Sequence, residues 1–117
     1  MTTTLYGISN CDTIKKAKKW LETNNINYQF HDFRKDGLSR QWLEQTEAKL
    51  GWETLLNKRG TTYRQLDEQT KTNMTRDTAL DIMADSPAII KRPVLSHNAS
   101  LYVGFKSDDY EEIFNHE

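Results

Sequence analysis

The sequence has a single cysteine, and this scarcity excludes several classes of protein. Cys11 has no second cysteine with which to pair, so an intramolecular disulfide and the disulfide-rich secreted class are excluded. Zinc sites built from several cysteines are excluded for the same reason. The histidines are scattered along the chain without ligand spacing, so we expect no dedicated metal site and surface or hydrogen-bonded roles for His31, His97 and His116.

An excess of one charge and long apolar runs are also missing. The chain has 16 Lys and Arg against 17 Asp and Glu, so no overall field directs it to nucleic acid or to an anionic membrane. No apolar run approaches the ~20 residues that span a bilayer, and residues 1–7 lack the basic and apolar regions of a secretory signal. We therefore expect a cytoplasmic protein that binds neither nucleic acid nor membranes.

The length and the aromatic content favour one folded domain. At 117 residues the chain has room for a single core, although its hydrophobic fraction is only 36%. Aromatic residues make up 10% of the chain, and each can bury a large area. The sequence therefore predicts one domain over residues 1–117, and we expect it to be a monomer.

The first third of the chain has the pattern of a strand, a helix and a second strand. Residues 3–8 are rich in β-forming types, and the capping residues at 9–13 precede a helical pattern that ends near residue 24. Residues 27–33 then alternate as a half-buried strand does. The apolar residues that share the inner face of the helix are Ile14, Ala17 and Leu21.

Cys11 lies in the turn between the first strand and the helix. Strands connected through a helix run parallel, and ligands usually bind at the carboxyl ends of such strands. Free backbone N–H groups and the helix dipole favour a thiolate at a helix N-terminus, and Lys15 adds positive potential one turn further on. The polar turn favours an exposed thiolate at Cys11, although an arbitrary lone cysteine is more often a buried filler.

The middle of the chain is expected to be mainly helical. Helical spacing dominates from about residue 38 to residue 85. The elements expected there are a helix capped by Ser39 and stopped by Gly51, short helices around residues 53–57, a polar loop at 59–62 and a helix capped by Thr75.

The last third returns to β character before a final helix. Residues 89–105 contain the β-forming runs of a hairpin, with a turn at 96–100. Ser107 caps the final helix, and Asp108 and Asp109 in its first turn favour the helix dipole.

Two basic pairs flank regions that can approach Cys11, and each contains an arginine. Arginine binds oxyanions and carboxylates through paired hydrogen bonds, so Arg59 and Arg92 are candidate binding residues. A solvated surface is nevertheless the usual role of such pairs. Pro93 follows Arg92, and only about one X–Pro bond in twenty is cis, so this position alone favours an ordinary trans proline.

Ordered segments of the chain resemble the ArsC/Spx family, in particular its small single-cysteine members of the YffB type. These segments are residues 5–13, 55–63, 90–94 and 103–105, and the resemblance covers nearly the whole chain. It implies an α/β, thioredoxin-like (ArsC-type) fold, in which helices flank both sides of a mixed sheet. It also implies a mostly helical insertion after the second strand, at about residues 38–85, and a cis peptide bond before Pro93.

The resemblance also implies a chemistry for some of these residues. In the arsenate reductases of this family, a thiolate takes up arsenate, arginines hold the oxyanion, and glutathione with glutaredoxin resolves the adduct. Cys11 and Arg92 match that scheme. Asn57 stands where those enzymes carry an arginine, with Arg59 two positions on, and Gly7 lies in the region of a family histidine. A third family arginine, beyond the proline, has no counterpart, and these departures weaken the case for arsenate.

The Spx branch of the family implies a different role. Spx uses a CxxC redox switch, and the second cysteine position is Ile14 in this chain. A disulfide switch of that kind is therefore impossible here. Binding to a protein partner such as RNA polymerase, without redox sensing, stays an alternative.

The combined hypothesis is a glutathione-dependent thiol reductase. Cys11 attacks a small-molecule or protein disulfide, and an external thiol resolves the mixed disulfide because the chain has no second cysteine. We expect glutathione as co-substrate, glutaredoxin as a partner and no bound cofactor. A non-enzymatic, Spx-like regulatory module and a weak arsenate reductase are the alternatives. The residues expected to contact substrate or glutathione are Arg92, Arg59, Pro93, Lys15 and Asn10.

Overall fold

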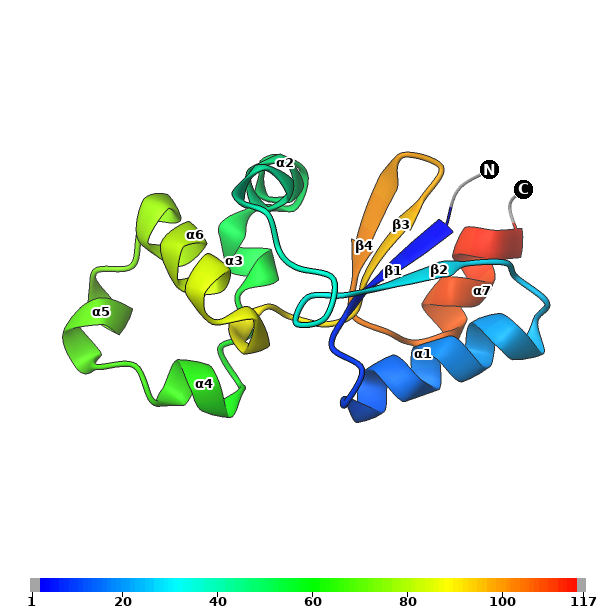
Figure 1. Cartoon of the computed structure of the whole chain (residues 1–117), viewed down its shortest axis with the longest axis horizontal. Coiled ribbons are helices and arrows are strands. Elements are labelled where there is room, and N and C mark those ends of the chain that lie inside the picture. The colour runs from blue at the N-terminus through cyan, green and yellow to red at the C-terminus, as the bar shows by residue number, and fades with distance from the viewer. Residues whose placement is uncertain (1–2, 116–117) are drawn as a thin grey trace. The chain divides into compact units, whose positions relative to one another are not determined.

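The structure is a computed structural model that describes residues 3–115. The chain divides into two compact units (Figure 1). Unit 1 combines the N-terminal part up to Asp32 with the C-terminal part from Arg92, and unit 2 spans Phe33–Lys91. The expectation of one domain over residues 1–117 stays a prediction.

A four-stranded mixed sheet forms the centre of unit 1, in the order β2-β1-β3-β4. β1 and β2 are parallel, as the predicted strand–helix–strand pattern requires, and β3 is antiparallel to both β1 and β4. β2 and β4 are therefore the two edges of the sheet. The strands are β1 (Thr3–Gly7), β2 (Gln29–Asp32), β3 (Val94–His97) and β4 (Ser100–Val103).

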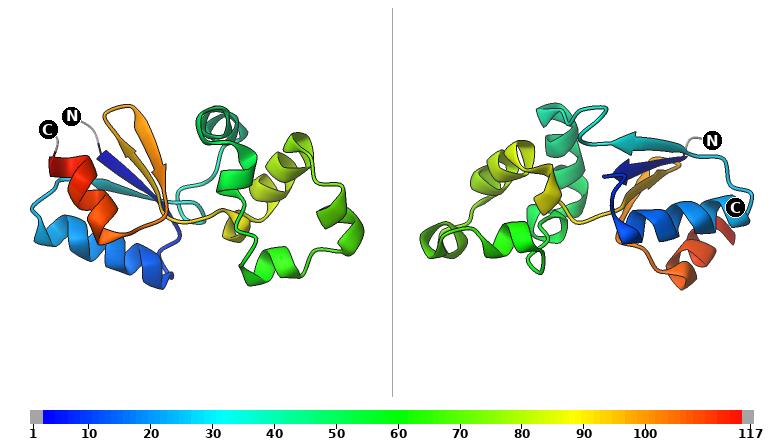
Figure 2. Two further views of the ribbon diagram at one scale, coloured as in Figure 1. Left: turned by 180° about the vertical axis from the view of Figure 1, so that it is seen from behind. Right: turned by 60° about the horizontal axis from the view of Figure 1, so that its bottom comes forward.

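Two helices, α1 (Asp12–Thr23) and α7 (Ser107–Asn115), cover one face of this sheet (Figure 2). The side chains of directly paired residues in neighbouring strands share a face, and Leu5 of β1 is paired with Leu95 of β3. Within unit 1 both helices pack on this one face, whereas the resemblance implied helices on both sides. The buried core that the sheet and the two helices share consists of Leu5, Ala17, Leu21, Leu95 and Tyr110.

The first helix has the inner face that the sequence predicts. Ile14, Ala17 and Leu21 recur at helical spacing and are each 0% exposed. The Lys15 N–H donates to the Cys11 carbonyl at 3.0 Å and closes the first turn. The helix ends where Asn24 caps it, close to the predicted end.

β3 and β4 form the predicted hairpin, with a tighter turn than expected. Only Asn98 and Ala99 lie between the strands, and both have positive φ, at 51° and 69°. Two such residues are typical of a type I′ turn, whose twist matches that of the strands. The turn therefore fixes the register, in which His97 pairs with Ser100.

Unit 2 is helical, so the predicted helical insertion is confirmed. The predicted caps are present, because Ser39 Oγ accepts from the Trp42 N–H and Thr75 Oγ1 accepts from the Thr78 N–H. Gly51, with a φ of 87°, ends the first of these helices as expected. The elements are α2 (Arg40–Leu50), α3 (Trp52–Leu55), α4 (Thr61–Arg64), α5 (Glu68–Thr72), α6 (Arg76–Asp85) and the 3-10 helix η1 (Pro87–Ile89).

Three details of this region were predicted wrongly. Thr61 and Thr62 lie in α4 and not in a polar loop, and α5 was not predicted. Neither helix buries a residue, so no apolar periodicity marks them in the sequence. Ile89 belongs to η1 and Ile90 forms an isolated bridge with Leu56, so neither residue is part of the hairpin.

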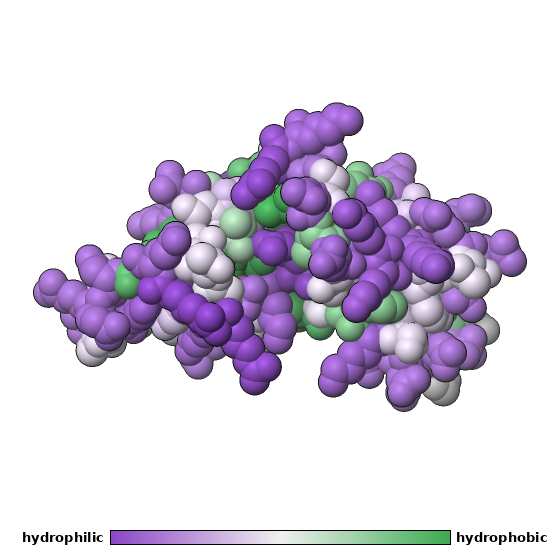
Figure 3. All heavy atoms as spheres, turned by 90° about the horizontal axis from the view of Figure 1, so that it is seen from below, coloured by the Kyte–Doolittle hydropathy of each residue, from purple (hydrophilic) through white to green (hydrophobic). Residues whose placement is uncertain are grey.

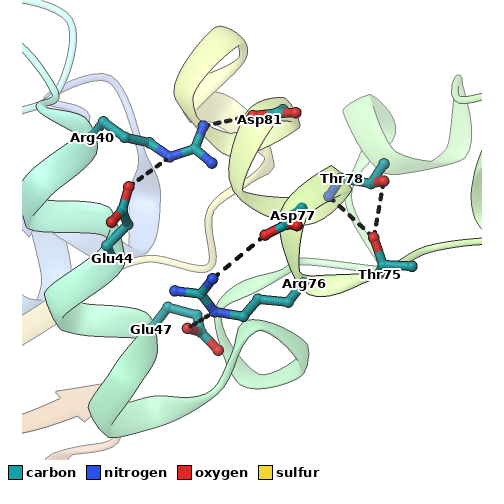
Figure 4. A network of polar contacts seen from close by, with 8 residues as sticks. All are labelled: Arg40, Glu44, Glu47, Thr75, Arg76, Asp77, Thr78 and Asp81. Atoms are coloured by element: carbon teal, nitrogen blue, oxygen red, sulfur yellow. Dashed lines mark hydrogen bonds and ion pairs between the residues drawn. The ribbon is translucent and has the colours of Figure 1, made fainter.

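Ion pairs join α2 to α6 over the core of unit 2 (Figure 4). Arg76 Nε lies 2.6 Å from Glu47 Oε1, whose side chain is only 10% exposed. Arg40 spans from Glu44 on its own helix to Asp81 on α6, at 3.2 and 2.6 Å. The more exposed pairs contribute little, because solvent screens them. The buried side chains beneath include Leu43, Leu55, Leu80 and Met83.

One face of the chain, drawn in Figure 3, is mostly hydrophilic, with small hydrophobic areas between hydrophilic side chains. Within residues 3–115, no helix has the length and apolar character needed to cross a membrane.

Candidate active site

Cys11 lies at the junction of β1 and α1. It is the N-cap residue of α1, with the extended backbone of that position (φ −147°, ψ 127°). Its side chain is partly buried. The first backbone N–H groups of a helix have no partner inside the helix, so they are available to a negative charge at this position.

The pKa of the Cys11 thiol lies below its ordinary value. Partial burial alone would raise this pKa, because it removes the thiolate from water. The backbone N–H of Ile14, the side chain of Arg92 and the backbone N–H of Thr13 act in the opposite direction, since each stabilises the thiolate. Together they outweigh the effect of burial, so the site favours a nucleophilic sulfur.

Arg92 is brought to Cys11 by the pairing of β1 with β3. Val94 of β3 is paired with Tyr6 of β1, so the residues just before β3 lie beside the residues just after β1. The Arg92 side chain lowers the pKa of the Cys11 thiol, both by hydrogen bonding to the thiolate and through its positive charge. This pair is the part of the predicted site that the structure brings together.

The Arg92–Pro93 peptide bond is cis. The resemblance implied this geometry, whereas the position of the proline alone favoured a trans bond. Pro93 is buried, and its carbonyl accepts a hydrogen bond from the Gly104 N–H at 2.8 Å. The backbone beside Arg92 is therefore tied to the residue that follows β4.

Gly7 allows β1 and α1 to approach closely. A Cβ atom on Gly7 would clash with Ile14 Cδ1 and would lie 3.0 Å from Ile14 Cγ1. Ile14 is 0% exposed and lies in the first turn of α1, where its N–H faces Cys11. A side chain at position 7 would therefore press on the turn that stabilises the thiolate.

Asp32 holds the loop that carries Cys11, and sequence reasoning did not identify it. Its Oδ2 accepts a hydrogen bond from the Ser9 N–H at 3.2 Å, and its side chain is buried at 6% exposure. Asp32 ends β2 and is paired with Gly7 at the end of β1. The predicted parallel pairing of these strands was the signal that could have located it, because it places both carboxyl ends together.

The other predicted contact residues are exposed. Lys15 points to solvent and is not among the groups that lower the pKa of Cys11, and Asn10 is exposed in the preceding loop. Arg59 belongs to unit 2, where its backbone N–H donates to Asn57 Oδ1 at 3.3 Å. The roles of these residues in binding stay predictions.

Two of the histidines, His97 and His31, make contacts within the fold. His97 is buried, and its Nδ1 lies 2.7 Å from Thr3 Oγ1. His31 packs against the ring of Tyr6, with 5.3 Å between the ring centroids. His116 lies outside the described residues. Within the described part of the chain, no group of three or more His, Cys, Asp or Glu side chains could hold a metal ion.

Comparisons with known proteins match most of this chain. The ArsC family model matches residues 6–113. An uncharacterized protein of Haemophilus influenzae is 47% identical over 111 residues, which cover 95% of this chain and 97% of that protein. The global transcriptional regulator Spx of Lactiplantibacillus plantarum is 28% identical over 109 residues, which cover 90% of this chain and 80% of the regulator.

Solved structures give the same result. The YFFB (PA3664) protein matches with a TM-score of 0.89 and 44% identity, over 95% of this chain and 97% of that structure. An arsenate reductase (ArsC) related protein from Brucella melitensis matches with a TM-score of 0.83 and 46% identity, over 97% of this chain and 95% of that structure. These likenesses confirm the predicted ArsC-type, thioredoxin-like fold.

Proposed function

Because this chain belongs to the ArsC family, we propose that it is a thiol-dependent oxidoreductase in which Cys11 is the nucleophile. The lowered pKa of Cys11 carries the proposal, because a thiolate is the reactive form of cysteine. The Arg92 guanidinium beside the sulfur suits substrates with an anionic group. The substrate class that we propose is a disulfide, and the electron donor is glutathione.

The reaction is proposed to proceed by two thiol–disulfide exchanges. The Cys11 thiolate attacks one substrate sulfur, the bond between the two substrate sulfurs breaks, and the other sulfur leaves as a thiolate that takes a proton from water. The thiolate of glutathione then attacks the substrate sulfur held on Cys11. This step releases the Cys11 thiolate and a mixed disulfide of substrate and glutathione. A second round with that mixed disulfide yields the second substrate thiol and oxidised glutathione.

The residues around the sulfur are proposed to bind and orient the reactants. Arg92 holds a carboxylate of the substrate or of glutathione, and Arg59, Lys15 and Asn10 are further candidates for such contacts. Pro93 shapes the backbone beside the sulfur. An external thiol is required because the sequence offers no second cysteine.

A test of this proposal measures reduction of 2-hydroxyethyl disulfide and of a glutathionylated peptide, with glutathione as donor. Cys11→Ser is expected to abolish turnover while the far-UV circular dichroism spectrum stays unchanged. Arg64→Gln in the exposed helix α4 is the control and is expected to keep full activity. Turnover that survives in Cys11→Ser would contradict the proposal. Release of arsenite from arsenate, with glutathione and glutaredoxin, tests the weak arsenate reductase in the same variants.

A second candidate is a partner-binding regulator, which the 28% identity to Spx over most of the chain favours. Such a role would not need the sulfur. Stoichiometric binding to purified RNA polymerase by both the wild-type chain and Cys11→Ser would support this candidate. Binding that requires Cys11, or no binding, would leave the oxidoreductase as the better account.

A further inference from the structure

We propose that unit 1 has a second binding surface, a groove between β4 and α7 that binds an extended, basic segment of a partner protein. The segment pairs with the open edge of β4, and its basic side chains lie against carboxylates of α7. This surface does not use Cys11. The inference therefore goes beyond the proposed function and does not depend on it.

The groove contains a cavity of about 500 Å³. Residues 102–104 form one wall, and Asp109, Tyr110, Glu112 and Ile113 of α7 form the other. This volume lies within the range of ligand-binding pockets, ~300–1,000 Å³. The walls combine apolar side chains with carboxylates, so the cavity suits a side chain with an apolar stem and a positive end.

The hydrogen bonds of the hairpin determine which backbone groups of β4 face outward. In a hairpin with a two-residue turn, the residues that flank the turn exchange hydrogen bonds, and every second pair does so thereafter. The hydrogen bond from the Gly104 N–H to the Pro93 carbonyl continues this alternation beyond the strand. The N–H and C=O groups of Leu101 and Val103 therefore point away from β3, along the edge that has no further strand among the described residues.

β4 has no charged residue, proline or bulge, and these are common protections of an edge strand. Proteins commonly guard such edges with charged residues, prolines or bulges. The sequence of β4 is Ser-Leu-Tyr-Val, and its register with β3 runs without a bulge. An unguarded edge offers its backbone groups to an incoming strand, which is a common mode of peptide recognition.

The charge of α7 selects a basic occupant. This helix carries four carboxylates and no basic residue. Asp109 and Glu112 are exposed, lie about one turn apart and line the cavity. Lys106 precedes the helix and does not line the cavity. A lysine or arginine of a segment paired with β4 would meet these two carboxylates, and complementary charge of this kind gives specificity.

A second copy of this chain fits the edge less well than a basic segment. Pairing of β4 with β4 of another copy would bring two α7 helices together, and their carboxylates would repel one another. An acidic partner would meet the same repulsion. The occupant that fits both the edge and the charge is an extended segment with alternating basic residues.

The experiment begins with a selection from a random peptide library displayed on phage, with the full-length chain as target. The expected result is enrichment of peptides with Lys or Arg at alternating positions. A synthetic copy of the most enriched peptide is then titrated into the chain. Enrichment of acidic peptides, or of no basic pattern, would overturn the proposal, as would a dimer of the chain that forms without any peptide.

Variants of α7 provide a matched comparison. Asp109→Lys with Glu112→Lys reverses the two charges in the groove and is expected to weaken binding of that peptide by at least ~10-fold. Asp108→Lys with Glu111→Lys makes the same change of net charge on the same helix, at exposed positions outside the cavity wall. It is expected to weaken binding by less than ~3-fold. Equal losses in the two double variants would overturn the groove as the binding site.

Hydrogen exchange tests the strand pairing itself. Bound peptide is expected to slow exchange of the Leu101 and Val103 amides by at least ~10-fold. The Tyr102 amide already faces β3 and serves as an internal control. Unchanged exchange at Leu101 and Val103 would rule out pairing with β4. Cys11→Ser is expected to bind the peptide as the wild-type chain does. The test of peptide binding is therefore independent of the test of the proposed function.

Discussion

At the scale of single residues, the state of the Cys11 sulfur depends on groups that act in opposite directions. Partial burial disfavours the thiolate, while Arg92 and two backbone N–H groups favour it. Arg92 contributes both a hydrogen bond and a charge, and it is the one side chain among these groups. It is therefore the contribution that a substitution can remove directly.

We expect Arg92→Gln to raise the pKa of Cys11 and to slow its alkylation at neutral pH. Burial would then act against fewer stabilising groups, and the fraction of thiolate at a given pH would fall. In Arg92→Lys the pKa of Cys11 is expected to lie between its values in the wild-type chain and in Arg92→Gln, because lysine keeps the charge and loses the planar group of arginine. The measurement is the iodoacetamide rate as a function of pH, with Arg64→Gln as control. An unchanged profile in Arg92→Gln would show that Arg92 does not act on the sulfur.

A second prediction at this scale concerns Tyr110. Its hydroxyl is buried and has no hydrogen-bond partner among the described residues, so removing it should relieve a desolvation cost. Tyr110→Phe is expected to leave the free energy of unfolding unchanged or to raise it by up to ~1 kcal/mol. Urea denaturation of the wild-type chain and of Tyr110→Phe measures the difference in their free energies of unfolding. A loss of more than ~1 kcal/mol would mean that the hydroxyl has a partner in the folded chain.

At the scale of elements, three pieces of secondary structure position the sulfur. β1 ends at Gly7, α1 begins directly after Cys11, and Asp32 at the end of β2 binds the intervening loop through the Ser9 N–H. The tight contact between Gly7 and Ile14 sets how closely the strand and the helix approach. The geometry of the site is therefore a property of this junction as well as of its side chains.

We expect Gly7→Ala to destabilise the chain by ~1–3 kcal/mol, because the added Cβ overpacks a buried contact. The displaced first turn should also raise the pKa of Cys11, since the Ile14 N–H faces the sulfur. Ile14→Val removes the Cδ1 atom that meets the new Cβ, so it should restore part of the stability lost by Gly7→Ala. Urea denaturation of the single and double variants measures this coupling. Additive losses would show that the two residues do not press on each other.

The elements that the sequence predicted well are those with a buried face. Ile14, Ala17 and Leu21 mark the inner face of α1, and Ser39 and Thr75 mark the starts of two helices in unit 2. The short helices α4 and α5 bury no residue, so no apolar pattern marked their positions. Patterning therefore located the elements that build a core and missed those that lie on its surface.

At the scale of the whole molecule, the site depends on pairing between distant parts of the chain. Cys11 was predicted at a helix N-terminus from local sequence, but its contact with Arg92 follows from the antiparallel pairing of β1 with β3. The sequence alone gave no measure of the distance between Cys11 and Arg92. It also favoured a trans bond before Pro93, whereas the bond is cis. The family resemblance supplied the expectation that Cys11 and Arg92 share a site and the expectation of a cis bond before Pro93. Asp32 was missed because its hydrogen bond to the Ser9 N–H joins residues that lie far apart in the sequence.

Membership of the ArsC family and the single cysteine together define the proposed chemistry. The structure places Cys11 at the start of α1, and because the sequence has no second cysteine, the proposed chemistry requires that another molecule supply the resolving thiol. The proposed chemistry depends on an activated sulfur. The state of Cys11 in the folded chain is therefore its central claim.

The most direct test is the rate of Cys11 alkylation as a function of pH, measured on the folded wild-type chain and on the same chain in urea. The single cysteine makes the signal unambiguous. Because the folded environment favours the thiolate, the midpoint should lie at lower pH in the folded chain than in the unfolded one. A folded midpoint equal to or above the unfolded midpoint would contradict the account, because the sulfur would then be an ordinary thiol.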